Sequence, residues 1–453
     1  MNHYSRRRFL KLGSQTLAGA GLALGAHPAL TLAKAADSGA QPYEDYRALV
    51  CVYLEGGCDG FSLMVPTGSH EHQEYAASRG QLAIPRNQLL ELQGGQSALG
   101  LHPAAERLQA LFDDEKLAMI ANVGTLVEPT SREQYMNNEV DVPAQLFSHS
   151  DQSIQWQQLQ GRDRSTEGWG AKSAEYLSGS QERDYLTSIS LAGSNYWQSG
   201  AGQRPFSLTE SGVLQYQGMD GSNDWQQPRR DAFERVMNIP RHHVFTKAYA
   251  DLQKRAMSIT TELGQVLDGN AGLFSDQPAD NTLAQKLNMV AQLIAAQDQL
   301  GLRRQIFYVS MRGFDVHDNQ SLEQPRLFSE LTEALSFFQN KIDMLGMGQH
   351  VTTFTASDFG RSLLSNGDGT DHGWGNHLMV MGGAVKGGSI YGQLPSLELN
   401  GPDTVHNGRI LPSTSATQYA ATLLRWIGLD DAARHEVLPT LRNFSEHDLG
   451  FFA

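Results

Sequence analysis

Residues 48–60 read ALVCVYLEGGCDG, and this stretch decides the fold. The first seven residues form a continuous apolar run, which is typical of a strand buried on both faces of a parallel sheet. The run ends before Gly56 and Gly57, which allow a tight turn, and Asp59 follows. The pattern predicts a central strand with a carboxylate just beyond its carboxyl end.

Similar apolar runs recur along the chain and alternate with helical patterns. Helical spacing of apolar residues indicates helices at 282–302, 322–345 and 413–427. This alternation predicts an α/β fold, a doubly wound, mostly parallel sheet with helices on both faces. Region 152–238 is rich in Gln, Ser, Gly and Trp with weaker periodicity, and we expect an insertion or cap there. The other predicted strands are 117–123, 306–311, 351–355 and 378–381.

The chain is large and acidic. It has 453 residues, 40% of them hydrophobic, which is enough for a large core and excludes a disordered or disulfide-built protein. The net charge of -14 argues against a surface built to neutralise nucleic-acid phosphates or anionic lipid. An anionic substrate remains possible, because a bound cation can invert the potential locally. We therefore expect no nucleic-acid partner.

The N-terminus resembles a twin-arginine export signal. Residues 5–11 read SRRRFLK, a weakly apolar stretch follows at 12–26, and residues 33–35 read AKA, a small-residue cleavage pattern. Such a signal is read by a translocase and does not anchor the protein. A membrane helix is the alternative, but the apolar run is shorter than the ~20 residues that span a bilayer. No later segment is long and apolar enough for a stable span either.

Export has consequences for the mature chain. We expect residues 1–35 to be removed, leaving a domain at 36–453 in the periplasm or outside the cell. Removal takes away five basic residues and no acidic one, so the net charge becomes -19. The only cysteines are Cys51 and Cys58, which an extended chain would hold about 23 Å apart. We expect two free, buried thiols, unless the chain doubles back and brings them within disulfide reach.

Carboxylates and imidazoles gather where the predicted strands end. They occur in residues 313–318 (GFDVHD), 357–361 (SDFGR) and 370–377 (TDHGWGNH). Ligands bind beyond the carboxyl ends of parallel strands, so these side chains should meet at one edge of the sheet. Oxygen from Asp with nitrogen from His suits zinc, manganese or iron better than calcium. The candidate metal ligands are Asp59, Asp315, His317, Asp358, His372 and His377.

Each candidate also has an ordinary structural role available to it. Asp59 precedes Gly60 and could be a turn residue, and Asp358 could cap a helix beginning near Arg361. Histidines in the 370–377 loop could be structural, and we expect His102 to be an outer-shell or structural residue. The placement of all these residues after successive strands favours a metal site.

These motifs together resemble a known family. Residues 54–60 (LEGGCDG), 313–320 (GFDVHDNQ), 357–361 and 370–377 look like the signatures of domain-of-unknown-function family 1501, whose exported members this chain resembles. The likeness extends through 382–388 (GGAVKGG) and covers nearly the whole mature chain. The family in turn is remotely similar to the alkaline phosphatase and sulfatase superfamily, which implies a doubly wound α/β fold with a metal centre at the strand ends.

The resemblance implies a role for each candidate, with one departure. Asp59 matches the carboxylate after the first strand, Asp315 and His317 match a ligand pair, and His372 matches a later isolated histidine. Asp358 matches the Asp of an Asp-His element, but Phe359 stands where that element has histidine. Either His377 or Asp371 replaces the missing ligand, or a single metal binds.

The implied activity is metal-dependent hydrolysis of phosphate or sulfate esters. The expected cofactor is a divalent transition metal, zinc or manganese, and the expected substrate is a small-molecule or glycan-type anionic ester. Ser148, in residues 146–152 (LFSHSDQ), resembles the Ser-His element of the family and is the candidate nucleophile, although it could be a plain surface serine. Arg361 could hold an anionic oxygen or lie on a helix surface.

A protein of another class also accounts for these features. Phe359 and the absence of an obvious nucleophile are compatible with a non-catalytic protein of the same fold that binds an envelope ligand or a partner.

Overall fold

The computed structural model describes residues 43–93, 98–162, 165–179, 183–201, 204–213, 224–240 and 243–453. The predicted signal at 1–35 lies outside the described residues, so its cleavage stays a prediction. None of the helices in the described part of the chain combines the length and the apolar character needed to cross a membrane.

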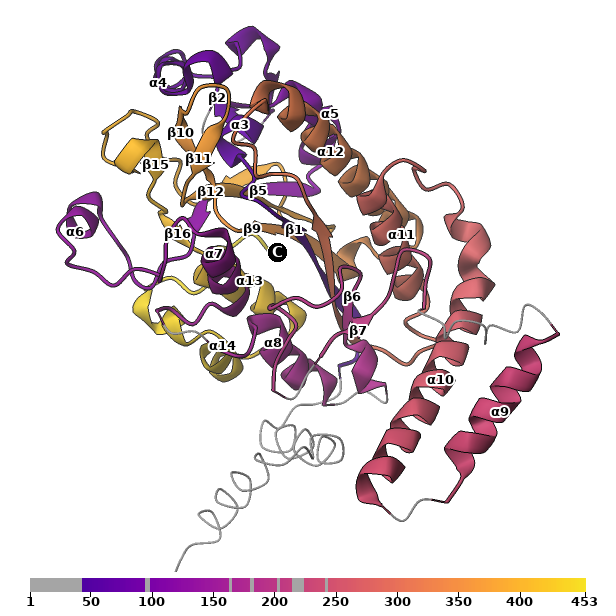
Figure 1. Ribbon diagram of the computed structural model, residues 1–453. Coiled ribbons are helices and arrows are strands. Elements are labelled where there is room, and N and C mark those ends of the chain that lie inside the picture. Colours follow the sequence, from indigo (N-terminus) through magenta and orange to yellow (C-terminus); the bar gives the residue numbers. More distant parts are fainter. Residues whose placement is uncertain are drawn as a thin grey trace, which may run out of the picture.

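A nine-stranded sheet forms the centre of the molecule (Figure 1), in the order β13-β5-β12-β9-β1-β8-β6-β7, with β16 paired to β5. Strand β1 (Arg47–Leu54) lies between β8 (Arg304–Met311) and β9 (Val351–Ser357) and is parallel to both. The sheet is mostly parallel, as predicted. The other strands are β5 (Leu117–Gly124), β6 (Ser188–Ser190), β7 (Phe206–Ser207), β12 (Asn376–Met381), β13 (Ser389–Tyr391) and β16 (Thr414–Ser415).

Strand β1 is buried on both faces because its side chains alternate between two cores. The even-numbered residues from Ala48 to Leu54 pack in the core on one face, and the odd-numbered residues from Leu49 to Tyr53 pack in the core on the other. The continuous apolar run is therefore the expected pattern for this position. Both cysteines are free and buried, which confirms the prediction made for them.

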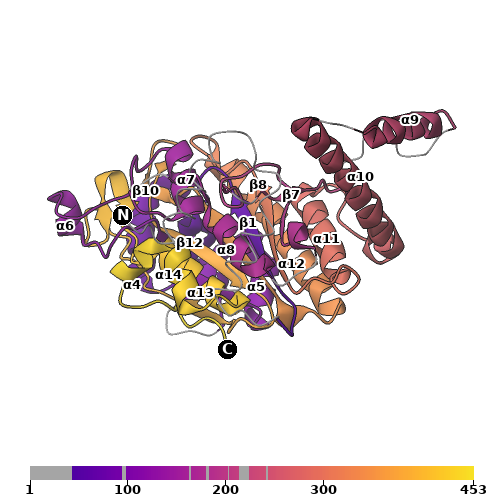
Figure 2. The ribbon, with the colours of Figure 1, turned by 90° about the horizontal axis from the view of Figure 1, so that it is seen from below.

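Helices cover both faces of the sheet (Figure 2), which confirms the predicted doubly wound α/β fold. One face carries α5 (Glu106–Asp113), α11 (Thr282–Ala295) and α12 (Gln320–Met344). The other carries α7 (His149–Gln158), α8 (Trp169–Ser178), α13 (Ala416–Ile427) and α14 (Asp431–Val437).

The predicted helix boundaries differ from the observed ones by three or more residues at two places. Helix α11 ends seven residues before the predicted end at 302, and α13 begins at Ala416 rather than at 413. In α13 the reason is a capping box, in which Ser415 and Gln418 satisfy each other's backbone N–H groups. Strand β12 runs antiparallel to its neighbours β5 and β9, which the sequence pattern did not indicate.

Short elements surround the carboxyl-end edge of the sheet. They comprise helices α3 (Gly60–Leu63), α4 (Ser69–Arg79) and α6 (Arg132–Met136), and three small sheets. The strands of these sheets are β2 (Met64–Pro66), β3 (Leu90–Glu91), β4 (Leu99–Leu101), β10 (Arg361–Ser365), β11 (Thr370–His372), β14 (Thr404–Val405) and β15 (Arg409–Ile410).

The region predicted to be an insertion contributes to several parts of the molecule. It supplies β6, which joins the main sheet beside β8, and α8, which packs on one face. It ends in α9 (Gln226–Asn238), which with α10 (Val244–Asn270) forms a hairpin outside the layers of the sheet (Figure 1). The insertion at 152–238 stays a prediction.

Candidate metal centre

Four side chains from three separate segments converge at the carboxyl-end edge of the sheet. They are His149, Asp315, His317 and His372, and one ligand atom from each lies within 4.8 Å of the others. Asp315 and His317 follow β8, His149 is the first residue of α7, and His372 ends β11. Because β12 is antiparallel, the segment that leads into it reaches the same edge as the carboxyl ends of β8 and β9.

The donor atoms surround the carboxylate of Asp315. Its Oδ1 lies 3.1 Å from Nε2 of His149, 3.0 Å from Nε2 of His317 and 3.6 Å from Nε2 of His372. The Nε2 atoms of His317 and His372 are 2.9 Å apart. A tetrahedral ion with ligands at about 2.0–2.1 Å separates its donors by about 3.3 Å, so these distances are close to what such an ion requires.

The outer ring nitrogens fix which way the lone pairs point. Nδ1 of His149 lies 2.8 Å from Oδ2 of Asp358, and Nδ1 of His372 lies 2.6 Å from the carbonyl oxygen of Phe147. Both partners only accept, so in the neutral rings with Nδ1 protonated each Nε2 is the atom that can bind a cation. His317 presents Nδ1 to Asp371, with 3.5 Å between Nδ1 and Oδ1. Carboxylate or carbonyl partners of this kind are typical of metal-binding histidines.

One donor atom is left without a hydrogen bond. Nε2 of His149 is buried and has no hydrogen-bond partner, although the Asp315 carboxylate is near. A buried polar atom without a partner is costly unless something else satisfies it. Lone pairs facing one another beside a carboxylate are stabilised by a cation, so the donor set fits a divalent transition metal.

Two glycines allow the turn after β1 to approach Asp315 and Phe359 closely. Gly56 has φ +112°, and a Cβ there would lie 2.4 Å from the backbone nitrogen of Asp315. Gly57 has φ +82°, and a Cβ there would lie 2.5 Å from the Phe359 ring. A side chain at either position would displace these residues, so the GG pair is needed for the close approach.

Phe359 packs on the imidazoles instead of supplying a ligand. Its buried ring stacks on His372 with 4.7 Å between ring centroids and lies 4.7 Å from the ring of His149. His149, not His377 or Asp371, brings the additional imidazole to Asp315. His149 was not among the predicted ligands, although the LFSHSDQ segment that contains it was singled out for the neighbouring Ser148.

Asp358 fixes the orientation of the His149 ring through its Nδ1 atom. Its Oδ1 accepts a 2.6 Å hydrogen bond from the Tyr53 hydroxyl, and its Oδ2 accepts from His149 and from the Gly56 N–H. Hydrogen bonding to Asp358 raises the pKa of His149 despite its partial burial, and the Asp315 charge adds to the effect. The negative field that favours a proton on this ring also favours a metal cation. No helix begins near Arg361, so the capping alternative for Asp358 is wrong.

Arg361 orients Asp315. The guanidinium is buried on β10 and donates to Asp315 Oδ1 at 3.0 Å, to the Gly56 carbonyl at 3.2 Å and to Thr370. Burial alone would raise the pKa of Asp315, but Arg361 and the histidines outweigh it and lower that pKa. The helix-surface alternative for Arg361 is therefore wrong. Its hydrogen bonds go to protein acceptors, which differs from the predicted contact with a substrate oxygen.

Asp59 and His377 lie outside the four-residue group. Asp59 is buried in a 2.6 Å ion pair with Arg79, and it also accepts from Ser62 and from Gln320. Burial would raise the pKa of Asp59, but Arg79 lowers it. His377 is buried within β12, and its Nδ1 accepts the Asn122 N–H at 3.1 Å. Neither side chain turns a free donor towards Asp315.

Two further residues from the sequence analysis have local partners. The Ser148 hydroxyl precedes α7, donates to Asp151 Oδ2 at 2.7 Å and lies 3.2 Å from the Ser150 hydroxyl. His102 is buried, and its Nδ1 accepts the Ala104 N–H at 3.0 Å. Burial lowers the pKa of His102 to about 4, which keeps the ring neutral in a structural role.

A family model described as "Protein of unknown function (DUF1501)" matches residues 46–434. The chain belongs to this family. The match covers every segment that contributes to the four-residue group and confirms the resemblance drawn from the motifs. No curated protein matches the sequence.

Several solved structures are similar to this member of the family at low identity. A sulfatase from Pseudoalteromonas is 10% identical, with 91% of this chain and 73% of that chain covered and a TM-score of 0.35. A phosphonate monoester hydrolase from Silicibacter pomeroyi is 9% identical, with 85% and 74% covered and a TM-score of 0.36. The soluble domain of lipooligosaccharide phosphoethanolamine transferase A from Neisseria meningitidis is 8% identical, with 86% and 90% covered and a TM-score of 0.33.

Proposed function

We propose that this protein is a metal-dependent hydrolase of phosphate or sulfate esters. The observation that carries the proposal is the convergence of three Nε2 atoms on one carboxylate, with the outer nitrogens facing acceptors. His149, Asp315, His317 and His372 would hold one divalent transition metal, zinc or manganese. When bound, such an ion polarises an ester oxygen and lowers the pKa of an attacking hydroxyl.

Ser148 is the proposed nucleophile. It adjoins His149 in the chain, and its hydroxyl donates to Asp151, a carboxylate that can accept the proton. In the first step Ser148 Oγ forms a bond to phosphorus or sulfur while the bond to the leaving oxygen breaks, and Asp151 takes the serine proton and passes it to that oxygen, which leaves as the alcohol. In the second step water attacks the same centre, the serine ester bond breaks, and Asp151 passes one proton of the water to the serine oxygen.

Arg409 is the proposed binding residue for the anionic part of the substrate. Its guanidinium lies over the Phe147 ring at 4.0 Å, and its Nε donates to the His372 carbonyl at 2.8 Å. Arg361 is engaged by Asp315 and backbone carbonyls, so Arg409 is the better-placed cation for a small-molecule or glycan-type ester. We expect Arg409→Met to raise KM more than it lowers kcat. Arg409→Lys should have a KM between those of the wild type and Arg409→Met.

The test combines metal content with turnover. Elemental analysis of the purified protein should find about one zinc or manganese per chain, and His317→Ala should lose it, while the exposed control His70→Ala should retain it. The metal-loaded protein should hydrolyse at least one aryl phosphate, phosphodiester or aryl sulfate, and Ser148→Ala should not. Metal binding without turnover on the whole panel would favour the non-catalytic protein, for which the replacement of a ligand position by Phe359 is the supporting observation.

We also propose export through the twin-arginine translocase to the periplasm or beyond. The SRRRFLK segment and the AKA pattern support this route. Replacing Arg6 and Arg7 together by Lys should leave the unprocessed protein in the cytoplasm. Secretion of that variant at the wild-type level would refute the route without affecting the metal site.

A further inference from the structure

The hairpin of α9 and α10 carries many of the exposed apolar side chains. Among the described residues, six of the eleven exposed large apolar side chains lie between positions 225 and 249. We define the hairpin tip as His243, Val244, Phe245, Lys247 and Tyr249, at the N-terminal end of α10. Val244, Phe245 and Tyr249 are 59%, 51% and 59% exposed. A cluster of exposed apolar side chains marks an interaction site.

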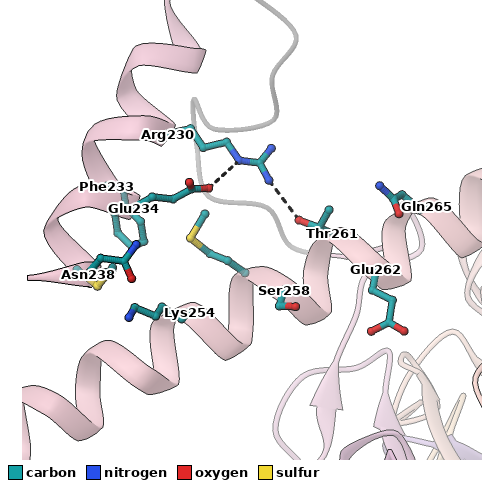
Figure 3. Close-up of a pocket in the computed structure, with 11 residues that line it drawn as sticks. Arg230, Phe233, Glu234, Asn238, Lys254, Ser258, Thr261, Glu262 and Gln265 are labelled. Carbon is teal, nitrogen blue, oxygen red and sulfur yellow. Dashed lines mark hydrogen bonds and ion pairs between the residues drawn. The ribbon is translucent and has the colours of Figure 1, made fainter.

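The groove between the two helices is a weaker candidate than the tip. Figure 3 shows the helices diverging around a hollow of about 550 Å³. Eight of its eleven lining residues are polar or charged, and Arg230 contacts Glu234 on its own helix and Thr261 on α10. The hollow therefore has a mixed polar and apolar lining, whereas Val244, Phe245 and Tyr249 of the tip are each more than half exposed.

The tip has the charge opposite to that of the whole chain. The protein has a net charge of -14, but the sequence contains no acidic residue between Glu234 and Asp251. Arg235 and Lys247 lie in this interval, and neither takes part in an ion pair with another described residue. Phe245 and Tyr249 are one helical turn apart and share a face. Aromatic and aliphatic side chains beside basic ones are typical of helices that bind an anionic bilayer surface.

The first turns of α10 separate the tip from the acidic body. Arg255 on α10 lies over the Tyr185 ring of the body at 5.5 Å. Roughly 16 Å of helix therefore separates Val244 from this contact, which is about twice the Debye length of about 8 Å at physiological salt. Figure 1 shows that the end of α10 nearest α9's C-terminus points away from the sheet. Repulsion between the body and a negatively charged surface is therefore screened when the tip touches that surface.

We propose that the hairpin tip docks on an anionic lipid bilayer. Val244, Phe245 and Tyr249 enter the interface between headgroups and acyl chains, and Lys247 and Arg235 contact the lipid phosphates. The overall charge argues against a broad lipid-binding surface, and the tip is a local exception to it. This proposal is independent of the metal centre and of its chemistry.

Vesicle flotation tests the proposal, using the protein without residues 1–35 so that the signal cannot bind lipid. Vesicles of phosphatidylcholine with phosphatidylglycerol should bind the protein, and vesicles of phosphatidylcholine alone should bind it much less. High salt should weaken binding. The double variant Phe245→Ser/Tyr249→Ser should bind about tenfold more weakly, because two aromatic side chains no longer leave water. Lys247→Glu should reduce the dependence on phosphatidylglycerol.

A matched control uses exposed apolar residues elsewhere. Leu322 and Met344 on α12 are 72% and 76% exposed, so Leu322→Ser/Met344→Ser should bind vesicles like the wild type. Circular dichroism and thermal unfolding establish that each variant folds. Equal binding of the wild type and the tip variant overturns the proposal, as does an absence of binding to either vesicle. Self-association in light scattering that the tip variant abolishes also overturns it, because the tip would then bind a second copy.

Discussion

Asp59 and Asp315, two of the aspartates at the edge of the sheet, both have histidines nearby, and the protein neutralises their charges differently. Asp59 is sealed by Arg79, and nearby His377 directs Nδ1 at a backbone N–H. Asp315 is 46% exposed at its side chain and faces the Nε2 atoms of three imidazoles. An aspartate and histidines at strand ends are therefore not enough for a metal site. The direction of the ring nitrogens and the exposure of the carboxylate separate the two regions.

The largest expected effect comes from removing the cation that pairs with the buried carboxylate of Asp59. Arg79→Met leaves the buried Asp59 carboxylate without its cation, and loss of one partner of a buried pair costs about 3–5 kcal/mol of unfolding free energy. Urea denaturation measures this loss. The partly exposed pair of Lys116 and Asp343, 2.9 Å apart, is the control, and Lys116→Met should cost about 0–1 kcal/mol. Equal losses of unfolding free energy in the two variants would mean that the Asp59 carboxylate is not buried from water.

The second test exchanges the aspartates one at a time and measures metal binding. Asp315→Asn removes the charged donor and should weaken affinity by more than the roughly 10–100-fold expected for losing an outer partner. Asp59→Asn should leave the affinity of the folded protein unchanged, because Asp59 pairs with Arg79 and lies outside the group. Competition with a chromogenic chelator gives both values. A strong loss in Asp59→Asn would place that residue in the ligand set.

A smaller effect is expected from the partner behind His149. Asp358→Asn keeps the shape but removes the charge that holds the Nδ1 proton, and we expect metal affinity to fall about 10–100-fold. Tyr53→Phe removes only a hydrogen bond to Asp358 and should have a weaker effect. Unchanged affinity in Asp358→Asn would show that His149 needs no support from this carboxylate.

The sequence was sufficient for the fold because the deciding signals are local. The apolar run at 48–54 is continuous because β1 is buried on both faces, and this requirement is visible in one segment. The direction of β12 was not visible, because residues 376–381 are equally apolar in a parallel or an antiparallel strand. That direction matters, because it brings His372 to the edge where β8 ends.

The candidate site was only partly predictable for a similar reason. Asp315 and His317 directly follow a strand, so sheet topology alone places them at the edge. His149 comes from the start of a helix, more than 150 residues earlier, and no strand precedes it directly. Asp59 resembled a ligand because the sequence does not show that Arg79, on a different helix, closes on its carboxylate.

The smallest expected effect is a pH dependence of stability that arises from the buried His377. Burial lowers the pKa of His377 to about 3, whereas an unfolded histidine titrates near 6.5. Below about pH 6.5 the unfolded chain binds a proton that the folded chain does not, so stability falls with falling pH through this window. At pH 5.5 the loss is about 1.4 kcal/mol relative to pH 7.5, and the folded pKa hardly affects this figure because it lies well below 5.5.

His377→Gln isolates this contribution, because glutamine does not titrate and its side-chain oxygen can accept the Asn122 N–H. Denaturation at the two pH values should show that the variant loses about 1.4 kcal/mol less than the wild type on acidification. His102 titrates in both proteins and therefore cancels, and the exposed control His70→Gln should behave like the wild type. An equal loss in His377→Gln and the wild type would mean that the ring is reached by water. The distinction between the two regions would then rest on Asp59 and Arg79 alone.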